Sequence, residues 1–318
     1  MPRVAILLCV FAATALADDN APRLTPIGPV EFKGEIGGPN DVSGAAVAGD
    51  FRVVVSDESP TVEVMRKIEG GYEVAYTLPL GPPDMEIDIE AVAADGATVY
   101  VSGSHNRIRN IGQKGGGGVG SVDDKPSRAQ VFQFTLGDDG KPGEVKTTSL
   151  RDVLKNHKVL GPFAVQASKE NGIDIEGLAF KAGRLYFGFR GPVLRDNWVP
   201  VLNCTFADPA GTANVGYINL DGRGVRDLVA VADGFLVLAG PMGDGDASTR
   251  LYHWDGKDGL APENPGKTTL LAEFPKAPKS AGKLEGVAVL KQSGTEYELL
   301  VVSDGPKNGA PTRWLLRR

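Results

Sequence analysis

One short phrase recurs along the chain and constrains its fold more than any other feature. Each copy is an acid followed by small and apolar residues, then a glycine turn and a second apolar segment. The clearest copy, Asp-Ile-Glu-Gly-Leu-Ala, occupies residues 174–179. Related copies begin at Asp88, Arg226 and Leu284, and a weaker one begins at Asp41. Because internal self-similarity is typical of repeat folds, we expect several equivalent units built around one core.

The spacing of the copies indicates which repeat fold to expect. The aligned third positions are separated by 47, 86, 51 and 58 residues, and they are Ser43, Glu90, Glu176, Asp227 and Glu285. Propeller blades recur about every 40 to 50 residues, and most units here offer four short apolar stretches bounded by turn residues. We therefore predict an all-β protein, a β-propeller of five blades. The 86-residue interval leaves a sixth blade open, and a two-sheet sandwich is the alternative architecture.

The ends of the repeat array suggest how the ring closes. The last unit lacks a fourth strand, and we expect an N-terminal strand at residues 30–36 to supply it, which would remove an exposed sheet edge. The third unit is also expected to be incomplete, with only residues 213–220 after its first two strands. The predicted organisation is a tail at 18–28 and a single propeller domain at 29–318. One short helix is expected at 149–157, capped by Ser149.

The first 17 residues resemble a secretory signal peptide. Arg3 precedes an apolar stretch at 4–16, and Ala-Leu-Ala at 15–17 forms a small-x-small cleavage site. The stretch is short for a membrane span. We expect an exported protein, periplasmic or extracellular, with no membrane span after cleavage.

Charge and cysteine content narrow the partners and the source of stability. The formal net charge is -6, and loss of Arg3 with the signal peptide would make it -7. This balance argues against nucleic acid or an anionic membrane as the main partner. Cys204 is the one cysteine beyond the signal peptide, so no intramolecular disulfide is expected. A large core or a closed topology must hold the chain instead.

The repeat also predicts a site. In a propeller, the start of the inner strand and the end of the next strand lie at the same face, so the acids of the phrase should gather around the channel mouth. The expected metal ligands are Asp88, Glu90, Asp174, Glu176, Asp227 and Glu285. Arg190 and Arg226 are expected to bind substrate, an anionic small molecule, and His105 is the candidate catalytic residue.

Carboxylates gathered in this way raise one another's pKa unless a cation neutralises them. Ca²⁺ suits the role because it takes six to eight oxygen ligands in tolerant geometry. Arg190 and Arg226 could neutralise the same carboxylates instead, through paired hydrogen bonds. The sequence leaves both means of neutralisation open.

Several of these phrases together resemble a bacterial family of uncharacterised proteins catalogued as domain of unknown function 3616. The phrases are Asp-Ile-Glu at 88–90, Gly-Ser-His at 103–105, residues 174–179, Gly-Phe-Arg-Gly-Pro at 188–192, Arg-Asp at 226–227 and Ala-Gly-Pro at 239–241. The resemblance covers roughly residues 41–306 and implies the propeller fold without an assigned reaction. Residues 174–179 are also similar to a motif of the esterase-like phytase family, whose members are exported propellers acting on phosphate esters.

Two functions follow as expectations. The first is an exported binding or scaffold module with an acidic, arginine-containing channel mouth that holds Ca²⁺. The alternative is a metal-assisted phosphoesterase, with metal on Glu90, Glu176 and Glu285, phosphate clamped by Arg190 and Arg226, and His105 as acid or base. Neutralisation by arginine alone would favour the first function. Oxygen ligands converging on a cation-sized hole would favour the second.

Overall fold

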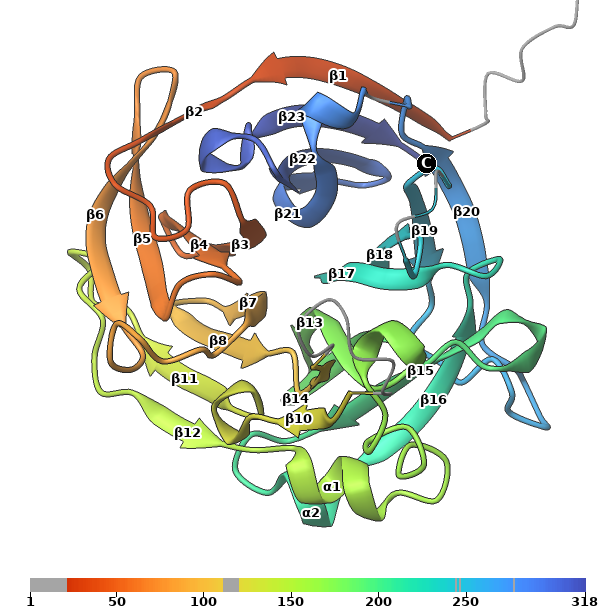
Figure 1. Cartoon of the computed structure of the whole chain (residues 1–318). Helices are drawn as coiled ribbons and strands as arrows, with labels where there is room; N and C mark the ends of the chain where they lie inside the picture. The colour runs from red at the N-terminus through yellow and green to blue at the C-terminus, as the bar shows by residue number, and fades with distance from the viewer. Residues whose placement is uncertain (1–21, 111–119, 244, 246, 277) are drawn as a thin grey trace, which may run out of the picture.

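Five β-sheets surround a central channel (Figure 1). The structure is a computed structural model, and it describes residues 22–110, 120–243, 245, 247–276 and 278–318. In every blade the innermost strand lines the channel and the chain runs outward through antiparallel neighbours. The prediction of an all-β propeller with five blades is therefore confirmed.

Each blade contains four antiparallel strands, ordered from the channel outward. Blade one contains β3 (Val42–Ala48), β4 (Phe51–Ser56), β5 (Thr61–Ile68) and β6 (Gly71–Pro79), with β2 (Glu31–Lys33) added in parallel outside β6. Blade two contains β7 (Ile89–Asp95), β8 (Thr98–Gly103), β11 (Val131–Thr135) and β12 (Lys146–Thr148). Blade three contains β13 (Asp174–Lys181), β14 (Arg184–Gly191), β15 (Trp198–Cys204) and β16 (Asn214–Asn219). Blade four contains β17 (Gly224–Val231), β18 (Gly234–Gly240), β19 (Arg250–Trp254) and β20 (Thr268–Glu273). Blade five contains β21 (Lys283–Ser293), β22 (Glu296–Asp304), β23 (Thr312–Arg317) and β1 (Arg23–Pro29).

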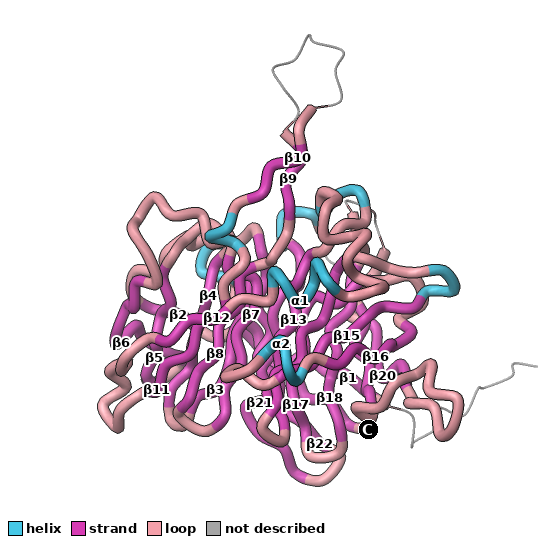
Figure 2. The backbone as a smooth tube through the Cα atoms, turned by 90° about the horizontal axis from the view of Figure 1, so that it is seen from below, coloured by secondary structure: helices cyan, strands magenta, loops and turns pink. Residues whose placement is uncertain are grey.

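The long interval between the second and third repeats holds no sixth blade in its described part. It contains a hairpin of β9 (Arg107–Arg109) and β10 (Val122–Asp124), which rises from one face of the disk (Figure 2). The helix expected nearby is α1 (Arg151–Asn156), but its N-cap is Leu150 and no side chain caps it. The hydroxyl of Ser149 instead accepts a hydrogen bond from the Arg151 amide.

The remaining helical elements are short. They are α2 (Pro209–Thr212) and five 3₁₀ turns, η1 (Pro126–Arg128), η2 (Ser168–Glu170), η3 (Arg195–Asn197), η4 (Lys279–Ala281) and η5 (Lys307–Gly309). Within the described ranges, no helix has the length and apolar character needed to cross a membrane.

The closing strand comes from the N-terminus, as expected, but from a different segment. Strand β1 pairs antiparallel with β23, so residues 23–29 belong to the propeller and not to a tail. The expected segment at 30–36 supplies only β2, where Phe32 is buried against Tyr72. The prolines of β1 obscured it in the sequence. They are tolerated because β1 is an outer strand with a register shift between Pro26 and Gly28.

Blade three is complete, contrary to the expectation from the sequence. Strand β15 pairs with β14 on one side and with β16 on the other. We missed it because Pro200 interrupts its apolar run. The residues expected to form the third strand, 213–220, contain the fourth, β16.

The hydrophobic core lies between neighbouring blades. Val53, Val55 and Val64 of blade one pack with Val99 and Phe134 of blade two, all of them buried. Equivalent clusters lie between the other neighbouring blades. Because each sheet is covered on both faces, its inner strands read as nearly continuous apolar runs.

The small residues of the repeat let the inner strands approach one another. A Cβ on Gly286 would lie 3.0 Å from the Gly44 Cα and 3.2 Å from the Ala45 amide nitrogen, on the neighbouring inner strand. A Cβ on Gly177 would lie 2.7 Å from a Val225 methyl group. This supports the expectation that these positions serve packing around the channel.

Removing the closing strand should destabilise the whole ring. We expect a chain that begins at Val30 to unfold at a temperature at least about 10 °C lower than one that begins at Pro22. The loss removes the β1–β23 hydrogen bonds and the packing of Leu24 against blade five, on the order of several kcal/mol. Circular dichroism melts of the two chains test this, and equal melting temperatures would contradict it.

Candidate functional site

A register break marks the start of every inner strand. In each case the pairing with the next strand skips one residue, and the skipped residues are Ser43, Glu90, Glu176, Arg226 and Glu285. A β-bulge of this kind re-aims the side chain of the extra residue. Four of the five, all but Ser43, are charged, and all five line one small cavity at the channel mouth. We call them the bulge ring.

The bulge ring corrects the alignment of the fourth repeat. The sequence placed Asp227 at the position of Glu176, whereas the structure places Arg226 there. Asp227 is buried and accepts hydrogen bonds from the backbone amides of Leu228 and Val287, each at 2.7 Å. Since Val287 belongs to β21, Asp227 ties blade four to blade five. It does not line the cavity.

Arg226 is the central cation of the ring. Its Nη1 donates to both oxygens of Glu285 at 2.8 Å and lies 3.1 Å from Oε2 of Glu176. Its Nη2 donates to the Pro241 carbonyl at 2.8 Å. Burial alone would lower the pKa of Arg226, but the two carboxylates more than offset this and raise it. Arg226 therefore stays charged and joins three consecutive blades.

Arg190 supplies a second positive charge from the end of β14. Its Nη1 donates to Oε1 of Glu176 at 2.8 Å and lies 3.8 Å from Asp174, and its Nε donates to the Met242 carbonyl at 3.0 Å. Arg190 is itself skipped by the register between β13 and β14. Glu176 is therefore held between two arginines.

Glu90 differs from the other two ring glutamates. Within the described ranges, no hydrogen bond or ion pair holds its carboxyl group. Burial, followed by the charges of Asp88 and Glu176, raises the pKa of Glu90 well above its usual range. Ser43 beside it uses its hydroxyl to donate to the Ile89 carbonyl at 2.6 Å. Glu90 is therefore the one ring glutamate that neither arginine contacts among the described residues.

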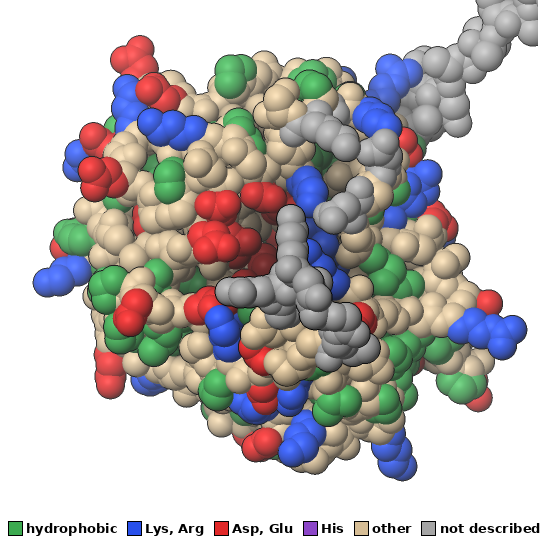
Figure 3. Space-filling view, in the orientation of Figure 1, with side chains coloured by type: hydrophobic (Ala, Val, Ile, Leu, Met, Phe, Trp, Pro, Cys, Tyr) green, Lys and Arg blue, Asp and Glu red, His purple; other side chains and the backbone are tan. Residues whose placement is uncertain are grey.

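The cavity has a volume of about 80 Å³. Besides the bulge ring it is lined by Asp41, Asp57, Arg190, Lys283 and Asp304. Six of the ten lining residues are acids and three are bases. Figure 3 shows acidic side chains along one side of the channel opening and basic side chains along the other. The site is therefore acidic overall, with its acidic and basic side chains on opposite sides of the opening.

Asp57 and Glu285 show how burial affects these acids. Burial, reinforced by the charges of Asp88, Asp304 and Asp41, raises the pKa of Asp57 to about 8. Burial raises the pKa of Glu285 to about 7, although Arg226 acts in the opposite direction. Both groups therefore titrate within the physiological range.

A second network lies beside the cavity and was missed in the sequence. Asn106 donates to Asp88 and to Asp174, each at 3.1 Å, and accepts from Arg128 at 2.7 Å. Arg128 also contacts Asp88 at 2.8 Å and Glu86. Burial and the charge of Glu176 raise the pKa of Asp174 to about 7. Arg128 and Asn106 flank the long loop between repeats, so no repeat pattern pointed to them.

His105 is held by the backbone. Its Nδ1 lies 2.9 Å from the Gly103 carbonyl, and its Nε2 accepts from the Leu150 amide at 3.3 Å. Burial lowers the pKa of His105 to about 4. It is 9% exposed and does not line the cavity, so its geometry is that of a neutral structural histidine.

The predicted metal ligands are therefore only partly brought together. Glu90, Glu176 and Glu285 share the cavity, Asp88 and Asp174 belong to the Asn106 network, and Asp227 lies between blades. In the part of the chain that the structure describes, no three His, Cys, Asp or Glu side chains converge with the spacing that a metal ion needs. The contacts that neutralise Glu176 and Glu285 come from arginine.

Replacing Arg226 should reveal its role in the ring. We expect Arg226→Met to lower the free energy of unfolding by about 3 to 5 kcal/mol at pH 8, because Glu176 and Glu285 lose a buried partner. The matched control is Arg66→Met, which breaks the exposed Arg66–Glu73 pair at 2.7 Å and should cost at most about 1 kcal/mol. Urea unfolding measures both, and equal losses would contradict the central role of Arg226.

The titration of Asp57 should be visible in the pH dependence of the free energy of unfolding. The folded protein holds this proton up to about pH 8, whereas the unfolded chain releases it near pH 4. This group therefore makes the free energy of unfolding fall as the pH rises from 4 to 8. We expect Asp57→Asn to flatten that fall, and the exposed substitution Asp84→Asn to leave it unchanged. Thermal melts between pH 5 and 8 test this, and an unaltered slope in Asp57→Asn would refute it.

Solved structures similar to this chain share little sequence with it. Glutaminyl cyclase of Myxococcus xanthus aligns with a TM-score of 0.49 and 11% identity, over 93% of this chain and 94% of that one. The PQQ-bound aldose sugar dehydrogenase of Streptomyces coelicolor aligns with a TM-score of 0.43 and 15% identity, over 94% and 98%. A luciferin-regenerating enzyme aligns with a TM-score of 0.42 and 11% identity, over 94% and 96%. No curated protein sequence matches the chain.

This chain does match one protein family by sequence. The match spans residues 141–313, which is more than half of the chain. It includes all of blades three and four and strands β21 and β22 of blade five, and it ends within β23. The bulge residues Glu176, Arg226 and Glu285 all lie within it. The chain therefore belongs to the family described as Protein of unknown function (DUF3616).

Proposed function

We propose that this protein is a small-molecule-binding propeller whose channel-mouth cavity takes a cationic group. The observation that carries the proposal is the charge balance of the cavity. Both arginines are already bound to the ring glutamates, and Lys283 is the third base of the lining. The acids Asp41, Asp57, Glu90 and Asp304 line the same space. A cation placed among them would relieve their mutual repulsion.

Two buried oxygen atoms support this proposal. Oε2 of Glu176, whose side chain is only 4% exposed, accepts no hydrogen bond among the described residues, although Arg226 lies 3.1 Å away. Oδ1 of Asp57 is likewise buried without a donor there. Buried polar atoms normally have a partner, so each oxygen is a candidate acceptor for a hydrogen bond from a ligand.

An ammonium group fits these oxygens better than Ca²⁺ does. It needs about three acceptors at hydrogen-bond distance. Ca²⁺ takes six to eight oxygens at about 2.3 to 2.6 Å. Of the three ring glutamates, Glu176 and Glu285 are engaged with Arg190 and Arg226, which leaves fewer oxygens than Ca²⁺ takes. Ca²⁺, which the sequence analysis expected, is therefore the second probe of the same site.

Binding is a better account of the site than phosphoester hydrolysis. A phosphate clamp needs arginine donors that can turn toward the substrate, whereas Arg190 and Arg226 bind Glu176, Glu285 and backbone carbonyls. An acid–base role for His105 would need a ring nitrogen that faces the cavity, and both nitrogens contact the backbone.

The proposal includes export from the cytoplasm. It rests on the signal-peptide pattern of residues 1–17, which lie outside the described residues. An exported binding protein would meet a ligand from outside the cytoplasm, and the ligand would not need to cross the cytoplasmic membrane.

Thermal melts with ethylammonium chloride and with CaCl₂, at pH 8 and constant ionic strength, test the proposal. We expect ethylammonium to raise the unfolding midpoint in proportion to the logarithm of its concentration once the site is occupied. Glu90→Gln should abolish that rise, and the exposed substitution Glu144→Gln should preserve it. A Ca²⁺ response that depends on Glu90 would assign the cavity to a metal ion instead of an ammonium group. No response to either probe, or responses unchanged in Glu90→Gln, would refute the proposal.

A further inference from the structure

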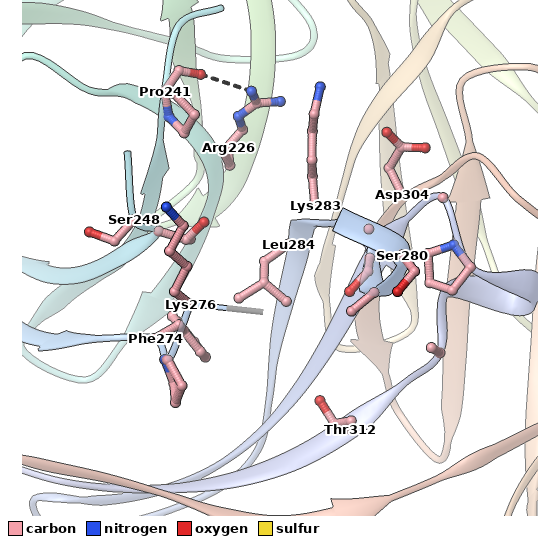
Figure 4. Close-up of a pocket in the computed structure, with 18 of the residues that line it drawn as sticks. Arg226, Pro241, Ser248, Phe274, Lys276, Ser280, Lys283, Leu284, Asp304 and Thr312 are labelled. Carbon is pink, nitrogen blue, oxygen red and sulfur yellow. Dashed lines mark hydrogen bonds between the residues drawn. The ribbon is translucent and has the colours of Figure 1, made fainter. Parts of the chain in front are cut away.

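A second and much larger cavity opens between blades four and five. Its volume is about 900 Å³, near the upper end of the range of about 300 to 1,000 Å³ that is usual for small-molecule sites. It shares Arg226, Lys283 and Asp304 with the channel-mouth cavity, so the two lie side by side at the same face. Figure 4 shows these three residues along one side of the cavity, with Phe274 and Thr312 on the opposite side.

The wall away from the channel is largely apolar. Phe274 and Trp314 meet edge to face, with ring centroids 5.2 Å apart, and Leu284 adds further apolar surface. The indole nitrogen of Trp314 donates to the Thr312 hydroxyl at 2.8 Å. Because this polar atom has its partner within the protein, a ligand beside Trp314 would meet mainly the apolar ring.

Hydroxyl groups line the same cavity, and they belong to residues that include Thr249, Ser280 and Ser303. Within the described ranges, the side chains of these three residues form no hydrogen bond. Ser303 is the most informative of them because it is only 6% exposed, and polar groups buried to this extent normally have a partner. A hydroxyl group can donate one hydrogen bond and accept two. A ligand in the cavity could therefore exchange several hydrogen bonds with this group of side chains.

Asp304 adds a carboxyl group to the lining. It accepts no hydrogen bond from a described residue, and a carboxylate can accept from several donors at once. Arg226 differs, because its Nη atoms already donate to Glu285 and to the Pro241 carbonyl and one of them also contacts Glu176. The cavity therefore favours a ligand that supplies hydroxyl donors over a ligand that supplies a negative charge.

We propose that this cavity is a second binding site, for a neutral oligosaccharide. A pyranose ring carries C–H groups on its faces and hydroxyl groups around its edge. One face would lie against Trp314, and the hydroxyl groups would bind Ser303 and Asp304. This site does not depend on the proposed cation site, because Ser280, Ser303 and Trp314 do not line the smaller cavity.

Three trisaccharides of glucose that differ in their linkage, maltotriose, cellotriose and laminaritriose, test the proposal. We expect at least one of them to change the tryptophan emission of the folded protein along a single saturable curve. The control ligand is tetraethylene glycol, a flexible chain with ether oxygens and only two hydroxyl groups. It should bind at least about tenfold more weakly, because it lacks most of the hydroxyl donors.

Variants assign the trisaccharide to this cavity. Ser280→Ala combined with Ser303→Ala should weaken binding about tenfold, because two hydrogen-bonding groups are lost. Trp314→Phe should remove most of the emission change, because the other tryptophans, Trp198 and Trp254, do not line the cavity. The matched control is Ser293→Ala, an exposed position at the far end of β21, which should bind like the parent. The unfolding midpoint of each variant, measured alongside, shows that it is folded.

Three results would overturn the proposal: no saturable emission change with any of the three trisaccharides, equal binding of tetraethylene glycol, or a double serine variant that binds like the parent. Glu90→Gln, which should abolish the response to ethylammonium, should leave trisaccharide binding unchanged. The two sites can therefore fail or succeed separately.

Discussion

The register break at the start of each inner strand is the constraint on which the rest of the site depends. A regular strand would alternate its side chains between the two neighbouring blades, and no residue would point consistently into the channel. By skipping one residue in every blade, the fold aims Ser43, Glu90, Glu176, Arg226 and Glu285 at one cavity. Small residues within the inner strands let them pack closely enough to bring these groups together.

Placing an arginine at one of the five equivalent positions makes this ring stable. Three glutamates around a narrow channel would repel one another if all were charged. Arg226 lies between Glu176 and Glu285 and contacts both, and Arg190 adds a second contact to Glu176. Neither arginine contacts Glu90, and burial together with the charges of Asp88 and Glu176 raises its pKa well above the usual range. The result is an acidic cavity in which two of the three ring glutamates are paired with arginine.

Much of the fold could be predicted from the sequence because the repeat encodes it. Period, strand pattern and unit count indicated five blades, and an incomplete last unit indicated closure by the N-terminus. The segment that closes the ring was misplaced because prolines in β1 resemble a loop, and β15 was missed for the same reason at Pro200. The acids of the site followed from the repeat. The equivalence of Arg226 with Glu176 did not, because it depends on a bulge register that is set by pairing across strands. Arg128 and Asn106 lie outside the repeat and needed the tertiary structure.

A crystal structure of the protein grown with MnCl₂, with anomalous data for manganese, tests most directly how the ring is neutralised. We expect the Arg226 guanidinium to lie between Glu176 and Glu285, at hydrogen-bond distance from both, with no anomalous peak between the two carboxylates. An anomalous peak bound by Glu176 and Glu285, with Arg226 turned away from them, would contradict it.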